Sequence, residues 1–121
     1  MKFTEIICRT PCSNKPNKNG IIMPTESIKN ACGCENLPFI DRDSPAGIIK
    51  NIIFDNENNQ VLARGFVWAN IADKIKEGYT FVPEIKVNNM DGQIVKDFEF
   101  MGFFLTNEPA IDSYTEIGEQ I

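Results

Sequence analysis

The chain has 121 residues, which is enough for one domain with a sizeable core and small for two. Its formal net charge is −5 at pH 7, and nucleic-acid binding needs a basic face, so we expect no nucleic-acid partner. No apolar run approaches the roughly 18 residues that span a bilayer, and the N-terminal residues lack the apolar core of a signal peptide. We therefore expect a cytoplasmic protein without membrane contact.

The chain contains no histidine. Histidine is the usual general base near neutral pH and the usual partner of a serine or cysteine nucleophile. Its absence excludes every Ser-His and Cys-His mechanism within one chain.

Short apolar runs separated by turn residues predict many short strands. β-Branched and aromatic residues fill these runs, while Gly, Pro, Asn and Asp fill the segments between them. In chain order, the expected extended segments cover residues 2–9, 21–23, 37–40, 46–54, 61–68, 80–87, 94–105 and 107–111. The acidic segment 112–121 is expected to be a loosely held tail.

Two compact patterns predict short helices. Thr25 is suited to cap a helix that reaches Ala31, and Gly33 follows as a left-handed stop. Asn70 is suited to cap a second helix, and Gly78 takes the corresponding position after its end.

A hairpin over residues 78–109 organises the predicted fold. Asp91-Gly92 marks its turn, because glycine tolerates the positive φ that tight hairpin turns require. Four of the nine phenylalanines lie in the return strand, the expected core strand: Phe98, Phe100, Phe103 and Phe104. We predict one mainly β (α+β) domain over residues 1–121, a small antiparallel β-barrel with two short helices.

Several fragments occur in an order that is familiar from one family of phage proteins. The fragments are NKNGII (17–22) with Pro24 and Glu26, LPFIDRDSPAGII (37–49), YTFVPEI (79–85), Asp91-Gly92 and LTNEPA (105–110). In this order they resemble the tailed-phage prohead proteases, which mature capsids, and in particular their Mu-like branch. The resemblance covers residues 14–111.

The resemblance implies a fold like that of the herpesvirus assembly proteases, a β-barrel in which a serine nucleophile pairs with a histidine. At the position of the family's histidine this chain has Arg42, beside Asp43. At the position of the family's serine, before Pro83, it has Val82. Valine has no nucleophilic atom, and arginine stays protonated across the usable pH range. We therefore expect the catalytic pair to be absent.

The resemblance also sets the functional expectation. A phage or prophage protein with this fold, lacking catalysis, is expected to act in capsid assembly or head structure through contacts with a capsid or scaffold protein, in the host cytoplasm or in the virion. It is also compatible with a homo-oligomer. One alternative is a small phage-encoded binding protein that inhibits a host factor. A second alternative is an active serine-type maturation protease with non-standard residues.

Four cysteines form two close pairs, Cys8 with Cys12 and Cys32 with Cys34. Two such pairs can supply four thiolates to one structural zinc ion. Free thiols without a common role are the alternative, and disulfides are disfavoured in a reducing cytoplasm.

Other polar groups have simpler interpretations. Thr80 shares a strand face with Val82, but without a base it is expected to be a surface threonine. Asp97 and Glu99 are expected on a solvated strand face. Two further expectations are that Arg42 forms a local salt-bridged turn with its neighbouring aspartates, and that Trp68 packs at the core or its rim.

Overall fold

Seven strands and two helices make up the structure, a computed structural model that describes residues 2–120. The end residues of the expected domain, Met1 and Ile121, lie outside the described residues. In chain order the elements are β1 (Phe3–Pro11), α1 (Thr25–Ala31), β2 (Glu35–Asp41), β3 (Ser44–Asp55), β4 (Gln60–Trp68), α2 (Ala69–Lys76), β5 (Thr80–Asp91), β6 (Ile94–Thr106) and β7 (Tyr114–Gln120).

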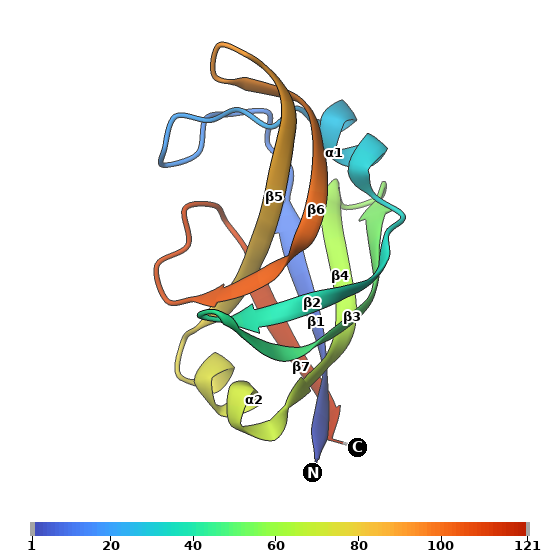
Figure 1. Cartoon of the computed structure of the whole chain (residues 1–121), viewed down its shortest axis with the longest axis vertical. Helices are drawn as coiled ribbons and strands as arrows, with labels where there is room; N and C mark the ends of the chain where they lie inside the picture. The colour runs from blue at the N-terminus through green and yellow to red at the C-terminus, as the bar shows by residue number, and fades with distance from the viewer. Residues whose placement is uncertain (1, 121) are drawn as a thin grey trace.

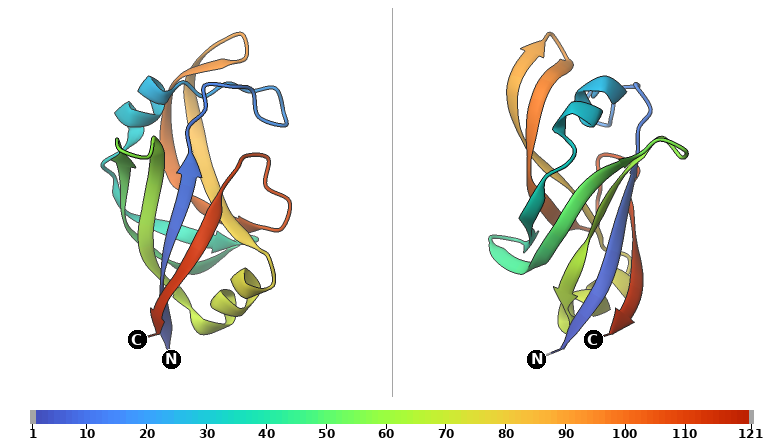
Figure 2. Two further views of the ribbon diagram at one scale, coloured as in Figure 1. Left: turned by 180° about the vertical axis from the view of Figure 1, so that it is seen from behind. Right: turned by 90° about the vertical axis from the view of Figure 1, so that its right-hand side faces the viewer.

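All seven strands belong to one open, strongly coiled sheet in the order β5-β6-β2-β3-β4-β1-β7 (Figures 1 and 2). Neighbouring strands run antiparallel except β2 and β6, which run parallel where Phe39 faces Phe103. The expectation of a mainly β fold with two short helices is confirmed. The expectation of a closed antiparallel barrel is wrong, because the sheet is mixed and its edges do not form a ladder.

Side-chain hydroxyls explain why the two edge strands, β5 and β7, approach each other without closing the sheet. The backbone N–H of Phe81 in β5 donates to Thr115 Oγ1 in β7 at 3.2 Å. The Phe81 carbonyl accepts a hydrogen bond from Ser113 Oγ at 2.9 Å. These backbone groups are thus satisfied by side chains, which removes the demand for a backbone partner strand.

Two glycines allow β3 and β4 to approach each other closely where the sheet curves (Figure 2). A β-carbon on Gly47 would lie 2.0 Å from the carbonyl oxygen of Phe66. A β-carbon on Gly65 would lie 2.1 Å from the carbonyl oxygen of Ile48. Both distances are far below van der Waals contact, so only glycine fits these positions.

Aromatic residues of β2, β5 and β6 form much of the core. The rings of Phe39 and Phe81 have centroids 4.6 Å apart, and both side chains are fully buried. Phe98, Phe100 and Phe103 are buried as expected, which confirms β6 as a core strand.

Phe104, by contrast, is 38% exposed on the outer face of the sheet. A bulge causes this difference: Ile85 of β5 faces Phe100 and Glu84 faces Gly102, so Met101 is left without a partner. The extra residue shifts the alternation of side chains, which keeps Phe103 inside and sends Phe104 outside.

Both predicted helices are present, with different starts. The residue before α1 is Pro24, and the residue before α2 is Trp68; neither makes a side-chain capping bond. The expected caps therefore lie inside the helices, and the backbone N–H of Thr25 instead donates to Asn14 Oδ1 at 2.8 Å. The expected left-handed stops are confirmed, with φ of +101° at Gly33 and +106° at Gly78.

The expected loosely held tail is wrong for residues 114–120, which form β7 along β1. An ion pair between Arg9 Nε and Glu116 Oε1 at 2.6 Å joins the two strands, and Ile117 packs against the core. The expected extended segment 107–111 is a series of bends. Residues 21–23 contribute one isolated parallel bridge, from Ile22 to Ile94, instead of a strand.

The organising hairpin is confirmed, with a tighter turn than expected. Asp91 pairs directly with Ile94, so residues 88–91 continue β5 and the turn consists of Gly92 and Gln93. The φ of Gly92 is +60°, the positive value that the Asp-Gly signal predicts.

Candidate functional site

The two positions that the sequence resemblance assigns to a catalytic pair, Arg42 and Val82, lie in the same part of the sheet. Val82 of β5 faces Phe104 of β6, and Phe104 in turn faces Ile40 of β2. Arg42 lies two residues beyond Ile40, in the tight turn between β2 and β3. One strand, β6, therefore separates Val82 from β2 and the turn that carries Arg42.

Arg42 adopts a conformation that is uncommon for a residue with a side chain. Asp41 pairs with Ser44, so the hairpin turn contains only Arg42 and Asp43. Such a short turn requires a positive φ, and Arg42 has φ of +59°. The turn presents an exposed arginine at the edge of the sheet's outer face.

A shallow depression of 590 Å³ surrounds this arginine, and we call it the Arg42 surface. Prolines and aliphatic or aromatic side chains form its floor, while Arg42, Asp43 and Glu84 supply charges. Its lining residues are Pro38, Ile40, Arg42, Asp43, Pro45, Glu84, Phe104 and Leu105. None of these lining residues carries a hydroxyl, thiol or imidazole, so the depression has no serine-, threonine- or cysteine-type nucleophile and no histidine base.

Val82 is only 5% exposed, although it lies outside the contiguous core cluster. It does not line the Arg42 surface. The Val82 side chain is thus chemically inert and is also closed to solvent.

The expected salt-bridged turn at Arg42 is wrong. Asp41 pairs instead with Lys74 of α2, with Lys74 Nζ 2.6 Å from Asp41 Oδ2. In the part of the chain that the structure describes, Arg42 makes no ion pair. Its guanidinium is therefore available to a ligand or partner.

Hydroxyl groups elsewhere are engaged in structural hydrogen bonds. Thr80 is 7% exposed, which contradicts its prediction as a surface threonine, and its Oγ1 lies 2.9 Å from Thr115 Oγ1. Ser27 Oγ lies 3.0 Å from the carbonyl oxygens of both Val95 and Lys96. These contacts tie strands and helices together and involve no general base.

The structure does not assemble the four cysteines into one metal site. Cys8 is fully buried in β1 and accepts a hydrogen bond from the hydroxyl of Thr115 at 3.6 Å. All four thiols are free. Within residues 2–120, no three Cys, His, Asp or Glu side chains gather closely enough to hold a metal ion. The residues as placed do not fit a four-thiolate zinc ion.

The surroundings of the thiols also disfavour thiolate formation. Burial raises the pKa of Cys8 to about 12, and this effect outweighs the hydrogen bond from Thr115, which acts to lower the pKa. Burial raises the pKa of Cys32 to about 11, and the nearby thiolates of Cys34 and Cys12 add to this increase. Because catalysis by cysteine needs the thiolate, the raised pKa values of Cys8 and Cys32 disfavour a role for these two thiols as nucleophiles.

The remaining polar candidates are simple surface features. Asp97 and Glu99 are exposed on the outer face of β6, and the Asn88 side-chain amide donates to Glu99 Oε2 at 3.3 Å. Trp68 is half-buried against the core at the start of α2, as its sequence context indicates.

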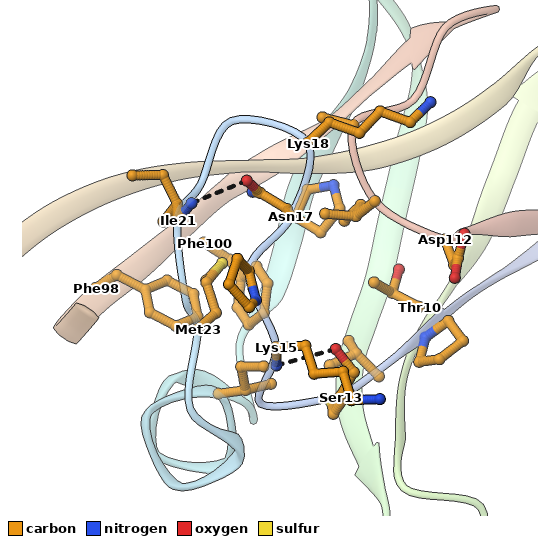
Figure 3. A pocket seen from close by; sticks show the side chains of 18 residues that line it. Thr10, Ser13, Lys15, Asn17, Lys18, Ile21, Met23, Phe98, Phe100 and Asp112 are labelled. Atoms are coloured by element: carbon orange, nitrogen blue, oxygen red, sulfur yellow. Dashed lines mark hydrogen bonds between the residues drawn. The ribbon is translucent and has the colours of Figure 1, made fainter. Parts of the chain in front are cut away.

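Sequence reasoning missed a second pocket, formed where the loop between β1 and α1 folds over the β5–β6 hairpin (Figure 3). Residues 10–20 are dense in Pro, Asn, Lys and Gly, which indicates only an exposed loop. No local signal shows that such a loop covers Phe98 and Phe100. The structure alone reveals this arrangement.

No family model, no curated protein sequence and no solved structure matches this chain. Among the described residues, neither helix is long and apolar enough to cross a membrane.

Proposed function

We propose that this protein is a non-catalytic, protein-binding component of tailed-phage head assembly, with a fold related to the prohead proteases. The observation that carries the proposal is the placement of Arg42 and Val82. Residues that match the family's catalytic pair lie in one part of the sheet, as a common ancestry requires, yet neither carries the chemistry. That family has a closed β-barrel. This chain has an open, coiled sheet, and side-chain hydrogen bonds join its two edge strands.

The Arg42 surface has the composition of a protein-contact site. Its apolar lining side chains offer contact area, and the largest of them, Phe104, is 38% exposed. Arg42 and Glu84 offer charges of both signs. Binding hot spots combine a buried aromatic anchor with arginine in this way, and a capsid or scaffold protein is the partner class that the resemblance implies.

A matched pair of variants tests the role of this surface. Phe104→Asp places a charge on the Arg42 surface, while Val87→Asp places one on the distal half of the same hairpin. The two side chains are comparably exposed, at 38% and 42%, so folding should tolerate both changes equally. A shared thermal midpoint would establish that both variants fold.

The assay follows the tagged protein during infection by the phage that encodes it, with purification of proheads. We expect the wild-type protein and Val87→Asp to be recovered with proheads, or with the capsid or scaffold protein. Loss of an aromatic anchor corresponds to about 2 kcal/mol, so Phe104→Asp should bind its partner about 30-fold more weakly.

Three outcomes would contradict the proposal. A stoichiometric host protein, with no capsid or scaffold protein, would identify a host-factor inhibitor. Cleavage of the co-expressed capsid protein, or labelling of the native chain by a serine-reactive probe, would identify an active protease. Equal recovery of Phe104→Asp and wild type would show that the contact lies elsewhere.

A further inference from the structure

The pocket under the loop between β1 and α1 has a volume of about 270 Å³ and shares no residue with the Arg42 surface. Five parts of the chain enclose it: the end of β1 with the following loop, α1, β4, the β5–β6 hairpin and residues 110–112. Its lining residues are Thr10, Pro11, Cys12, Ser13, Lys15, Pro16, Asn17, Lys18, Ile21, Met23, Ile28, Val61, Pro83, Phe98, Phe100, Ala110, Ile111 and Asp112. The packing contacts that hold the fold together do not require this cavity.

The interior of the pocket is apolar. Phe98 and Phe100 of β6 meet edge to face with ring centroids 5.1 Å apart, and both are buried. Met23 and Ile28 add flexible and branched aliphatic surface beside them. A cavity with such walls binds water poorly and accepts apolar groups, and the methionine can adapt its shape to an occupant.

The loop side of the pocket is polar and carries a local excess of positive charge (Figure 3). Lys15 and Lys18 outnumber Asp112, which gives the lining a net charge of +1 in a chain whose net charge is −5. Asn17 holds the loop in shape, because its Oδ1 accepts the backbone N–H groups of Asn19 at 2.8 Å and Ile21 at 3.1 Å. An anionic group is therefore favoured over a cation at this side.

We propose that this pocket binds an aliphatic carboxylate, with the hydrocarbon chain against the phenylalanine rings and the carboxylate toward the loop that carries Lys15 and Lys18. The volume sets the length of the chain. An apolar cavity of about 150 Å³ holds six-carbon benzene, so 270 Å³ holds about ten carbons. A medium-chain fatty acid such as decanoate is the class of ligand that fits.

A chain-length series tests the proposal on the intact protein by isothermal titration calorimetry. Hexanoate, octanoate, decanoate and dodecanoate differ only in the number of methylene groups. Burial of one methylene strengthens binding about fourfold, so the dissociation constant should fall by that factor per methylene up to decanoate. At dodecanoate the fall should stop, because the added carbons no longer fit.

Two probes of equal length examine the head group. Decylammonium and decanol carry the same hydrocarbon chain as decanoate with a positive or neutral head. We expect both to bind more weakly than decanoate, with decylammonium the weaker because it meets the two lysines. Equal binding of all three would overturn the assignment of a carboxylate site.

Variants locate the site. Ala110 lines the pocket from a half-buried loop position, so Ala110→Phe should fill the cavity and abolish decanoate binding without disturbing a strand. Lys15→Gln and Lys18→Gln should each weaken binding about threefold, as expected for a partly exposed ion pair. Lys76→Gln, an exposed lysine on α2, is the control and should have no effect.

The proposal fails if decanoate produces no heat of binding at millimolar concentration. It also fails if affinity does not depend on chain length, or if Ala110→Phe binds decanoate as tightly as wild type. None of these results concerns proheads, so this proposal and the proposed function stand or fall separately.

Discussion

Replacing Gly65 by alanine should lower the free energy of unfolding by about 2 kcal/mol. The added methyl carbon would lie 2.1 Å from the carbonyl oxygen of Ile48 and 2.9 Å from the α-carbon of Ile49. Both neighbours are backbone atoms of β3, which cannot rotate away as a flexible side chain would. Overpacking of this kind destabilises a protein by up to about 3 kcal/mol. Alanine is less flexible than glycine in the unfolded chain, which stabilises the folded state by about 0.4–1 kcal/mol and leaves a net loss of about 2 kcal/mol.

Urea unfolding, followed by the fluorescence of Trp68, the single tryptophan, measures this change. Thermal unfolding gives a second readout. In a domain of this size, each kcal/mol of lost stability lowers the thermal midpoint by about 4 °C, so Gly65→Ala should lower it by about 8 °C. Gly118→Ala is the matched control, because its β-carbon would lie no closer than 3.3 Å to another atom. If Gly65→Ala were as stable as wild type, the close approach of β3 and β4 would not exist in solution.

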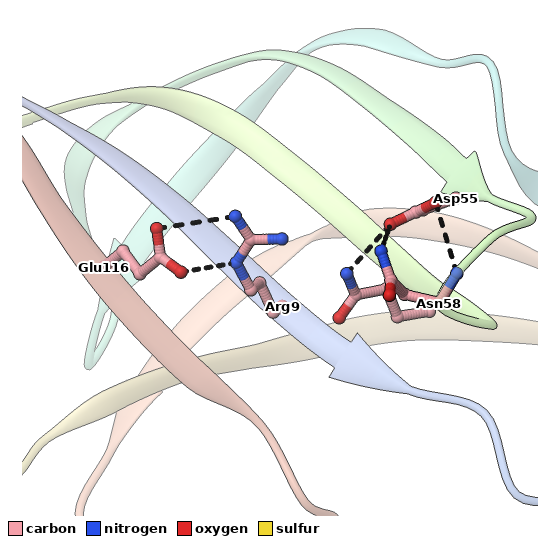
Figure 4. Close-up of polar contacts among 5 residues, drawn as sticks. Arg9, Asp55, Asn58 and Glu116 are labelled. Carbon is pink, nitrogen blue, oxygen red and sulfur yellow. Dashed lines mark hydrogen bonds and ion pairs between the residues drawn. The ribbon is translucent and has the colours of Figure 1, made fainter.

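Four further measurements test particular residues. Arg42→Gly should raise the free energy of unfolding by about 0.5–1 kcal/mol, since the left-handed conformation costs arginine about 1–2 kcal/mol, partly offset by the flexibility of glycine; an unchanged urea midpoint would argue against the two-residue turn. Hydrogen bonds from the side chains of Asn58 and Gln60 lower the pKa of Asp55 below its ordinary value of 3.8 (Figure 4). The stability from these contacts is fully present above the pKa that Asp55 has in the unfolded chain, and it is lost as the pH falls through the lower pKa of the folded state. Asp55→Asn removes this titration, so it should flatten the acid side of the plot of unfolding free energy against pH. The free energy of unfolding at pH 7 should stay unchanged only if the introduced amide keeps both hydrogen bonds. With its pKa raised to about 12 by burial, Cys8 should resist iodoacetamide at pH 8 until the protein unfolds, as peptide mass spectrometry can show; rapid native labelling would contradict its burial. Finally, the double change Val82→Ser with Arg42→His should remain unlabelled by a serine-reactive probe, because the position of the serine is 5% exposed.

Features that depend on neighbours in sequence could be predicted. The Gly92 turn, the polar loop between β3 and β4 and the stops at Gly33 and Gly78 follow from the φ values or solvation that these residues prefer. The burial of Phe98 and Phe100 follows from their alternation with polar residues along one strand.

Features that depend on distant parts of the chain could not be predicted. The parallel placement of β2 beside β6 and the docking of β7 on β1 have no local signal, because many strand orders satisfy the same alternation. The bulge at Met101 is similar: a β-carbon on the adjacent Gly102 would lie 2.5 Å from the carbonyl oxygen of Pro38, a contact that exists only after β2 is in place. The outward position of Phe104, which dominates the Arg42 surface, follows from this bulge.

The role of Arg42 and Val82 remains a proposal, and the surroundings of these two residues could not be predicted from the sequence. The resemblance assigns Arg42 and Val82 to a catalytic pair, and the register places β6 between the strand of Val82 and β2, which ends next to Arg42. It did not indicate that Val82 is covered or that Phe104 is exposed beside it. Because a protease must admit a peptide to its nucleophile, the covering of Val82 means that restoring a hydroxyl would not restore access. Both features support the proposed binding role, in which the outer face of the sheet would contact a partner through Phe104.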